Sequence, residues 1–274
     1  MNNLHLTSSR RQFLKRAILV SGAALAAGVG GYSLHSNIIE ITQHHLAGAL
    51  IEGRSLKIAV VSDFHAPRSF VTADDLSKAV NGAECHALFI LGDTIDDSSN
   101  LRLVTGLFKN IRVRGPKLAV LGNWEHWSGV DLAALSKAYD DAGVRLLVNE
   151  TLMFTPEGSR ITVVGLDDLI AGRPNFELVR GPKALQIVLA HCPASFDHVN
   201  SLAGGPTLTL SGHTHGGQIA PLGFALWLPQ GSGHYVRGWY HAGKHQLFVT
   251  RGLGNSIVPF RIGSRPELAI IQLS

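Results

Sequence analysis

Aspartate, asparagine and histidine residues stand directly after several short apolar runs of this sequence. They are Asp63, His65, Asp93, Asn123, His191, His213 and His215. Asp63 and His65 are separated by one residue, so in extended backbone they point the same way and can hold one metal ion; His213 and His215 repeat this spacing. Caps, turns or core hydrogen bonds would explain any one of these residues alone. They do not explain the whole set, which predicts a metal site.

The apolar runs that precede these residues are interpreted as buried strands, because they are apolar on both faces. These strands cover residues 56–61, 87–91, 117–121 and 185–190. Further strands are predicted at 160–165, 207–211, 246–250 and 267–273. Open α/β sheets gather their functional residues at strand ends, which is where this sequence places its candidates.

Two helices are predicted between the strands. Thr72 and Asp75 form a capping box, in which each side chain bonds the other's backbone amide, and the helix is expected to run to about residue 81 and end at Gly82. Apolar residues at helical spacing predict a second helix over 130–141, which Gly143 ends. Alternating strands and helices indicate a layered α/β or α+β domain.

The candidate residues resemble, in chain order, the motif series of the calcineurin-like metallophosphoesterases: Asp63-x-His65, Gly92-Asp93, Gly122-Asn123, a lone His191 and Gly212-His213-x-His215. The resemblance covers about residues 55 to 274. It implies the fold of that family, a four-layer α-β-β-α sandwich with two mixed β-sheets. The stretches 213–219, 251–254 and 265–267 also look like those of bacterial phosphodiesterases that carry twin-arginine signals.

The resemblance implies a set of ligands for two divalent metal ions. The first ion would be bound by Asp63, His65 and His215, the second by Asn123, His191 and His213, and both by a bridging Asp93. A bridging carboxylate offsets the repulsion between two cations about 3.5–4 Å apart, and the hydroxide they hold attacks phosphorus near neutral pH. Imidazole and carboxylate ligands suit manganese, iron or zinc better than calcium or magnesium.

One position departs from the family pattern. The family usually places a histidine directly after the asparagine, where it contacts the phosphate or protonates the leaving group, and then an acid. This chain has Trp124 in the place of that histidine, Glu125 in the place of the acid, and His126 next. Tryptophan cannot donate a transferable proton. Three readings stay open: His126 beside Glu125 is a displaced general acid, another residue does that work, or the leaving group needs no protonation.

Residues 1–36 are interpreted as an export signal. Ser9-Arg10-Arg11-Gln12-Phe13-Leu14-Lys15 precedes an apolar run that ends near residue 34, which is the layout of such signals. The segment resembles a twin-arginine signal, which implies a bacterial protein that the twin-arginine machinery exports already folded. The periplasm or the outer face of the cytoplasmic membrane would then be its place. An uncleaved anchor is the alternative, because the run approaches the roughly 20 residues that span a bilayer.

Composition predicts a buried core and argues against nucleic acid as the primary partner. The chain is 45% hydrophobic and 16% charged, which fits a folded domain. Its formal charge of +4 comes from four basic residues near the N-terminus, and without them 20 basic residues stand against 20 acidic ones. No clustered basic stripe remains to bind a duplex.

We assign residues 55–274 to one metallophosphoesterase domain and residues 37–54 to a lead-in segment. The pair His44-His45 in that segment is expected to be solvated, because no third ligand stands nearby. Cys85 and Cys192 are interpreted as buried free thiols.

Three further features are weighed against simpler explanations. Arg68 could bind a substrate phosphate with its two-pronged guanidinium, or be an exposed loop arginine without a role. Residues 251–255 are interpreted as a turn rather than a phosphate-binding loop. The apolar segment 221–229 is expected to be a packed loop; if Phe224 and Trp227 are instead exposed, they would contact a lipid or a sugar nucleotide.

These features predict a dinuclear metal-dependent phosphoesterase. We expect it to hydrolyse a phosphodiester or pyrophosphate bond by attack of metal-bound hydroxide. The substrate is expected to be a phosphorylated small molecule or a lipid-linked phospho-compound of the cell envelope, with peripheral contact to the membrane. A metal-binding envelope protein without turnover, suggested by Trp124, and a phosphomonoesterase are the alternatives.

Overall fold

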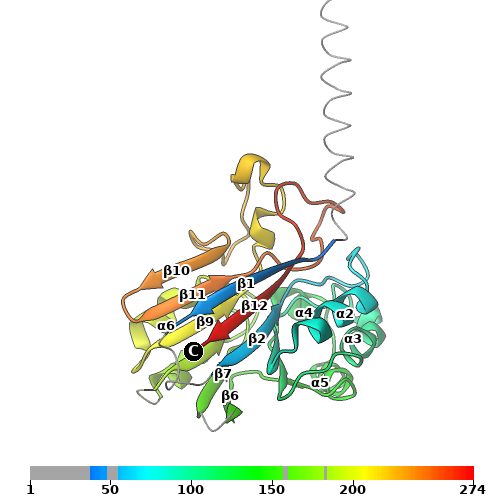
Figure 1. The fold of residues 1–274 in the computed structure, drawn as a ribbon. Coiled ribbons are helices and arrows are strands. Elements are labelled where there is room, and N and C mark those ends of the chain that lie inside the picture. The colour runs from blue at the N-terminus through cyan, green and yellow to red at the C-terminus, as the bar shows by residue number, and fades with distance from the viewer. Residues whose placement is uncertain (1–37, 48–54, 157–159, 182–183) are drawn as a thin grey trace, which may run out of the picture. The chain divides into compact units, whose positions relative to one another are not determined.

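The computed structural model describes residues 38–47, 55–156, 160–181 and 184–274. The predicted export signal, residues 1–36, lies outside these ranges. Within them, two six-stranded sheets face each other and helices cover their outer faces (Figure 1). This arrangement is the four-layer sandwich that the resemblance implies.

The first sheet has the strand order β1-β12-β2-β3-β4-β5. Its strands are β1 (Glu40–Leu46), β2 (Leu56–Val61), β3 (Ala87–Ile90), β4 (Lys117–Ala119), β5 (Val144–Leu146) and β12 (Glu267–Leu273). Strands β2 to β5 are parallel, β12 runs antiparallel to β2, and β1 pairs in parallel with β12. The sheet is therefore mixed, and the carboxyl ends of β2, β3 and β4 meet at one end of it.

The second sheet has the strand order β10-β11-β9-β8-β7-β6. Its strands are β6 (Glu150–Phe154), β7 (Ile161–Gly165), β8 (Gln186–Leu189), β9 (Thr207–Ser211), β10 (Gly238–Ala242) and β11 (His245–Val249). The four central strands are parallel, and the edge strands β6 and β10 are antiparallel to their neighbours. This sheet is also mixed.

Helices cover the outer face of each sheet. Those on the first sheet are α2 (Ala73–Ala83), α3 (Leu101–Phe108) and α5 (Leu132–Asp140), and those on the second are α6 (Ser195–Leu202) and the 3₁₀ helix η3 (Phe176–Arg180). Short helices stand in the loops: α4 (Asn123–Trp127), η1 (Ser98–Asn100), η4 (His215–Gly217) and η5 (Pro221–Gly223). In the described ranges, no helix has the length and apolar character needed to cross a membrane.

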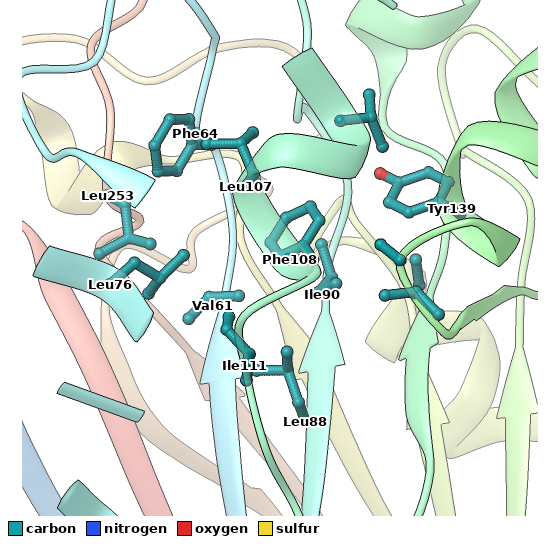
Figure 2. Packing of buried hydrophobic residues seen from close by; sticks show 14 of the residues in the cluster. Val61, Phe64, Leu76, Leu88, Ile90, Leu107, Phe108, Ile111, Tyr139 and Leu253 are labelled. Atoms are coloured by element: carbon teal, nitrogen blue, oxygen red, sulfur yellow. The ribbon is translucent and has the colours of Figure 1, made fainter. Parts of the chain in front are cut away.

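Apolar cores hold the layers together. Between the sheets, Phe89 and Leu118 of the first meet Leu208 and Phe248 of the second, all at most 1% exposed. Figure 2 shows the core between the first sheet and its helices, where Phe108 of α3 and Tyr139 of α5 lie over Ile90 of β3. A third core joins α6 and η3 to β7 and β8. Burial of these side chains is the main driving force for stacking the layers.

The two predicted helices are present, and one ends differently from the prediction. Thr72 and Asp75 form the predicted capping box at the start of α2. The prediction that Gly82 ends this helix was wrong, because α2 continues to Ala83 and Glu84 takes the left-handed conformation, with φ 51°. The Glu84 amide donates to the Asn81 carbonyl, so an internal hydrogen bond replaces the glycine stop.

Residues 40–46, interpreted from sequence as a lead-in, form strand β1 at the edge of the first sheet. His44 is half-buried, and its Nδ1 accepts a hydrogen bond from Trp239 Nε1 at 3.1 Å. Its ring also lies 4.6 Å from that of Phe248. The expectation of a solvated pair was therefore wrong for His44, whereas His45 is exposed.

Both cysteines are free and buried, as the sequence predicts. Burial raises the pKa of the Cys85 thiol to about 11. Burial and, to a smaller extent, the neighbouring Asp168 carboxylate raise the pKa of the Cys192 thiol well above its usual value. Neither sulfur is a thiolate near neutral pH.

Candidate metal centre

The seven predicted ligands lie together where strands of both sheets end. The loops after β2, β3 and β4 carry Asp63, His65, Asp93 and Asn123, and the loops after β8 and β9 carry His191, His213 and His215. Each of the seven is at most 5% exposed. Residues far apart in sequence thus form one buried polar cluster, as the sequence predicts.

The backbone is left-handed at five of these positions. The φ angles are 54° at Asp63, 51° at His65, 53° at Asp93, 73° at His213 and 52° at His215. Residues with a Cβ rarely adopt this conformation, which costs about 1–3 kcal/mol each and occurs most often at functional sites. Hydrogen bonds hold it in place: the Asp63 amide donates to Gly92 O and the His65 amide to Asp93 O.

Gly92 and Gly122 let two ligand-bearing loops touch. A Cβ on Gly92 would lie 2.7 Å from the Gly122 Cα, and one on Gly122 would lie 2.6 Å from the Asp93 amide nitrogen. Any side chain at either position would separate the loops after β3 and β4. The two glycines therefore bring Asp93 beside Asn123.

Asp63, His65 and His215 form the first group of candidate ligands. One ligand atom from each lies within 4.8 Å of the others. The two imidazole Nε2 atoms are 3.1 Å apart, and His215 Nε2 is 3.5 Å from Asp63 Oδ1. This is the trio that the resemblance assigns to the first metal ion.

Asp93, His191 and His213 form the second group. His191 Nε2 lies 3.1 Å from Asp93 Oδ2, 3.1 Å from His213 Nδ1 and 3.2 Å from Asn123 Oδ1. The same Asp93 Oδ2 is 3.7 Å from His65 Nε2, which belongs to the first group. Asp93 thus lies between the groups, where a bridging carboxylate is expected.

The chemistry of these donors fits two divalent cations. Burial lowers the pKa of His213 and of His215, so both rings are neutral near pH 7 and present a lone pair. Burial also opposes a charge on His191, but the carboxylates of Asp93, Asp63 and Asp168 together raise the pKa of that ring. A metal ion competes with such a proton and balances the same carboxylate. Imidazole, carboxylate and amide donors together suit manganese, iron or zinc.

Three of the histidines are oriented by a hydrogen bond from the ring nitrogen that points away from the cluster. His65 Nδ1 lies 2.5 Å from Asp96 Oδ1, His191 Nδ1 is 2.6 Å from Leu91 O, and His213 Nε2 is 2.7 Å from Gln230 O. Such contacts fix the ring and leave the other nitrogen for the metal. The sequence prediction missed Asp96, although its place three residues after Asp93 was a usable signal.

A buried arginine, also missed, supports the loop of His215. Arg261 Nη2 lies 3.2 Å from His215 Nδ1, and Arg261 Nη1 donates to Arg251 O at 2.8 Å. Burial lowers the pKa of Arg261 to about 10, so the side chain stays charged near pH 7. Residues 251–255 pack against the ligand loop, with the Gly254 amide donating to Asp63 O at 2.7 Å.

Glu125, a catalytic candidate from the sequence, is engaged elsewhere. It is 2% exposed, and its Oε2 accepts from the amides of Asp93 and Gly122, both at 2.9 Å. Its Oε1 accepts from the Thr94 amide at 2.6 Å. Burial and then the Asp93 charge raise the pKa of this carboxyl. Glu125 therefore joins the loops after β3 and β4, and its catalytic role stays a prediction.

His126, the other catalytic candidate, is bound to an aspartate that the sequence prediction missed. Its Nε2 lies 2.7 Å from Asp167 Oδ1, and this contact is the main reason that the pKa of His126 is raised. Asp167 Oδ2 in turn accepts from the Arg173 amide at 2.8 Å. A protonated His126 has a proton to give, but its ring does not line the described cavity. Its role as the general acid stays a prediction.

Trp124 takes the place beside the ligands. Its ring stands edge-on to His65, with centroids 5.9 Å apart, and its amide donates to Asp93 Oδ1 at 2.9 Å. The Arg68 guanidinium lies 5.6 Å above the Trp124 ring, and its Nε is 3.2 Å from Asp96 Oδ2. Arg68, the candidate for substrate binding, thus forms an ion pair with Asp96, the residue that orients His65. Its side chain is 45% exposed.

A cavity of about 550 Å³ opens at the cluster. The ligands Asp93, Asn123, His213 and His215 line it, together with Trp124, Trp127, Ile170, Leu226, Trp227 and Ile257 among other residues. A phosphate held at the ligands would therefore have mostly apolar surroundings.

The segment 221–229 differs from the expected packed loop. Phe224 is 75% exposed and Trp227 is 64% exposed, and Leu222 between the prolines is 96% exposed. The prediction of a packed loop was wrong, because the backbone of the segment is held at its base while its side chains extend outward.

Comparison with known proteins shows which family this chain resembles. The model of the family described as calcineurin-like phosphoesterase matches residues 56–217. The metallophosphoesterase YkuE of Bacillus subtilis is 33% identical over 97% of this chain and 97% of its own length. The phosphodiesterase YaeI of Escherichia coli is 29% identical over 97% of this chain and 99% of its own. A solved dimetal phosphatase from Danio rerio matches 74% of this chain and 89% of its own with 13% identity and a TM-score of 0.42.

The two mixed sheets and the paired ligand groups define a metal-dependent phosphoester hydrolase that binds two divalent ions. The chain belongs to the calcineurin-like phosphoesterase family.

Proposed function

We propose that this protein is a phosphodiesterase of the cell envelope that hydrolyses a phosphodiester or pyrophosphate bond. The observation that carries the proposal is the pair of adjacent buried groups, Asp63 with His65 and His215, and Asp93 with His191 and His213, beside an open cavity. The name of its relative YaeI, a phosphodiesterase, supports the choice of bond.

The ligands have separate tasks in this proposal. One cation would be held by Asp63, His65 and His215, the other by Asn123, His191 and His213, and Asp93 would contact both. When bound, two such cations supply positive charge that makes water a nucleophile near neutral pH and balances the phosphate oxygens. Asp96, Leu91 O and Gln230 O keep the histidine rings turned toward the cluster.

The cavity favours a substrate whose leaving group departs without a proton. Of the described residues that line it, the only titratable ones are the candidate ligands Asp93, His213 and His215. Trp124 occupies the lining near His65 and offers only an indole N–H. A general acid contributes on the order of a hundredfold to ten-thousandfold for poor leaving groups. Activated diesters and pyrophosphates are therefore better substrates for this site than alkyl phosphomonoesters.

Hydrolysis of two nitrophenyl esters tests the proposal. The purified full chain is assayed with bis-p-nitrophenyl phosphate and p-nitrophenyl phosphate in the presence of Mn²⁺, Zn²⁺ or Mg²⁺, beside Asp93→Asn. Metal-dependent turnover that prefers the diester and is lost in the variant is the expected result. A folded, metal-loaded protein without turnover from pH 5 to 9 would instead be a metal-binding envelope protein, and a preference for the monoester would make it a phosphomonoesterase.

We propose that residues 1–36 direct twin-arginine export, so that the domain works in the periplasm or on the outer face of the cytoplasmic membrane. The paired Arg10 and Arg11, followed by Phe13 and Leu14, support this place. Fractionation of a bacterial host tests it with Arg10→Lys/Arg11→Lys. We expect the parent outside the cytoplasm and the variant inside, and equal distribution of the two would rule out this route.

A further inference from the structure

Two uncharged loops stand at the mouth of the cavity, and we call them the apolar rim: residues 219–229 and 256–258. Large apolar side chains extend from both. Leu222 is 96% exposed, Phe224 75%, Leu226 69%, Trp227 64% and Ile257 71%. Soluble surfaces rarely gather so many exposed apolar side chains in one place, and such patches mark contact with an apolar partner.

The rim is held in this shape from below. The Gln218 side chain donates to Ser256 O at 3.0 Å and to Val258 O at 2.9 Å, which joins the two loops side by side (Figure 1, gold and orange-red). Arg237 donates to Gly223 O at 3.2 Å and to Gly263 O at 2.9 Å. Polar contacts therefore fix the backbone of the rim while its apolar side chains extend outward. The folded backbone itself determines that these side chains are exposed.

The charge around the rim selects the partner. No residue from 219 to 233 or from 252 to 260 is charged, and the whole stretch 198–266 contains neither aspartate nor glutamate. The nearby basic residues Arg237 and Arg265 are partly or fully exposed. Apolar loops that carry no acid and lie close in the chain to arginines match a bilayer of anionic lipids, which offers an apolar interior behind negative headgroups.

The rim is continuous with the metal centre. Leu226, Trp227 and Ile257 belong to the rim and also line the cavity that reaches Asp93 and His215. No lysine or arginine lines the described cavity, so it offers no cation for further phosphates of a nucleotide. A molecule whose phosphate lies at the ligands would place its remainder against apolar walls.

We propose that the apolar rim docks into the surface of an anionic bilayer and that the site draws a lipid-borne phosphodiester from it. The lipid portion next to the phosphate then enters the cavity directly from the bilayer and is not exposed to water. The docking is inferred only from the exposure of the rim side chains and the charge around them. The cleavage of the lipid also depends on the proposed function.

Fluorescence of Trp227 tests the docking. The full chain is mixed with phosphatidylglycerol vesicles whose acyl chains carry bromine, which quenches tryptophan on contact. We expect quenching in the parent and its loss in Trp227→Phe. Leu222→Ser/Phe224→Ser is expected to weaken the vesicle-dependent quenching by at least about tenfold, since two large side chains no longer enter the lipid. Phosphatidylcholine vesicles are expected to quench less, because they lack the negative charge.

A matched control removes two exposed apolar side chains elsewhere. Leu132 and Met153 are 46% and 61% exposed and stand on α5 and β6. Leu132→Ser/Met153→Ser is expected to be quenched like the parent. All these proteins share residues 1–37, so any contribution of that segment to vesicle binding is common to them.

Several outcomes would overturn the docking. The first is that the parent is not quenched, and the second is that the rim variant is quenched equally. The third is that the parent self-associates, the rim variant does not, and lipid leaves Trp227 unquenched. Quenching needs neither metal nor turnover, so a protein that docks but cleaves no diester overturns the proposed function alone. A protein that cleaves nitrophenyl diesters but is never quenched overturns the docking alone.

Discussion

At the scale of single residues, the ligands depend on carboxylates that are not ligands themselves. Asp96 meets His65 Nδ1, and Glu125 binds the amides of Asp93, Thr94 and Gly122. Both are buried among the loops that carry the ligands. Their loss should change how tightly the site binds metal before it changes the fold.

Asp96→Asn is expected to weaken metal binding about 10- to 100-fold, because the amide cannot hold the His65 ring as the carboxylate does. Metal content after dialysis against graded chelator concentrations measures the change. Asp97→Asn is the matched control, since Asp97 is exposed and caps η1 with a side-chain oxygen that asparagine keeps. Equal affinity in the two variants would contradict the role of Asp96.

His126→Ala is expected to reduce the rate on bis-p-nitrophenyl phosphate by far less than the about hundredfold that loss of a general acid costs. The reason is its position: the ring is bound to Asp167 and does not line the described cavity. Steady-state kinetics beside Asp93→Asn measure the effect. A hundredfold fall in kcat with metal content unchanged would instead identify His126 as the proton donor.

The ligands could be predicted from sequence, but their supports could not. Seven residues in a fixed order after apolar runs form a pattern, whereas Asp96 and Asp167 are single acids in loops, where capping and turns are the usual explanation. Contacts made by backbone atoms, such as Leu91 O and Gln230 O, leave no trace in residue type. Trp124 departs from a pattern only in comparison with the family, whose resemblance predicts a histidine at this position.

At the scale of elements, sequence found the interior of each sheet and missed its edges. The eight predicted strands correspond to β2, β3, β4, β7, β8, β9, β11 and β12, which are the interior strands of the two sheets. The edges β1, β5, β6 and β10 were not predicted. Interior strands are buried on both faces along most of their length, whereas β1 alternates half-buried and exposed residues along Glu40–Leu46 and contains two histidines. Helix α3 was also missed, with Gly106 in its middle.

Glu267 at the start of β12 ties three elements together. Its Oε1 accepts from Thr42 of β1 at 2.8 Å, and its Oε2 accepts from Thr250 Oγ1 at 3.0 Å and from the Arg251 amide at 2.8 Å. Burial, the largest single influence, would raise the pKa of this carboxyl, but the Arg251 charge and the hydrogen bonds from Arg251 and Thr42 together lower it. Its stabilising effect is therefore complete above the unfolded-state pKa of about 4.5 and is lost as pH falls through the lower folded-state value.

Glu267→Gln is expected to lower the free energy of unfolding by about 3 kcal/mol at pH 7, because Arg251 and the buried donors lose their charged partner. The difference from the parent should shrink as the pH falls below about 4.5. Urea unfolding at a series of pH values measures it. Glu84→Gln is the control, since the contact of Glu84 with Arg114 is exposed on both sides and contributes little. A loss that does not vary with pH would contradict the ion-pair explanation.

At the scale of the whole described domain, the metal centre joins two sheets. Asp63, His65, Asp93 and Asn123 come from loops of the first sheet, and the other three ligands from loops of the second. Bound cations would therefore hold the layers together in addition to the apolar core between them. A ligand that binds only the folded state stabilises it by mass action.

Removal of metal by a chelator is expected to lower the midpoint of thermal unfolding by about 5–10 °C, as follows from about 2.7 kcal/mol at a hundredfold excess of metal over its Kd. Differential scanning calorimetry with and without added Mn²⁺ or Zn²⁺ measures the shift. Asp93→Asn should show a much smaller shift, since it loses the residue between the two groups. An identical shift in parent and variant would mean that the metal acts elsewhere.

The two buried thiols determine whether this fold depends on the redox conditions of the compartment in which it forms. Cys85 lies in the core beneath the helices of the first sheet, Cys192 follows His191, and the chain has no third cysteine. With both sulfurs protonated and shut away from oxidants and from each other, no contribution to the stability of this fold depends on redox potential. The domain is then as stable in a reducing cytosol as in an oxidising compartment. A protein that folds on one side of a membrane and works on the other needs no disulfide-forming enzyme after it has crossed.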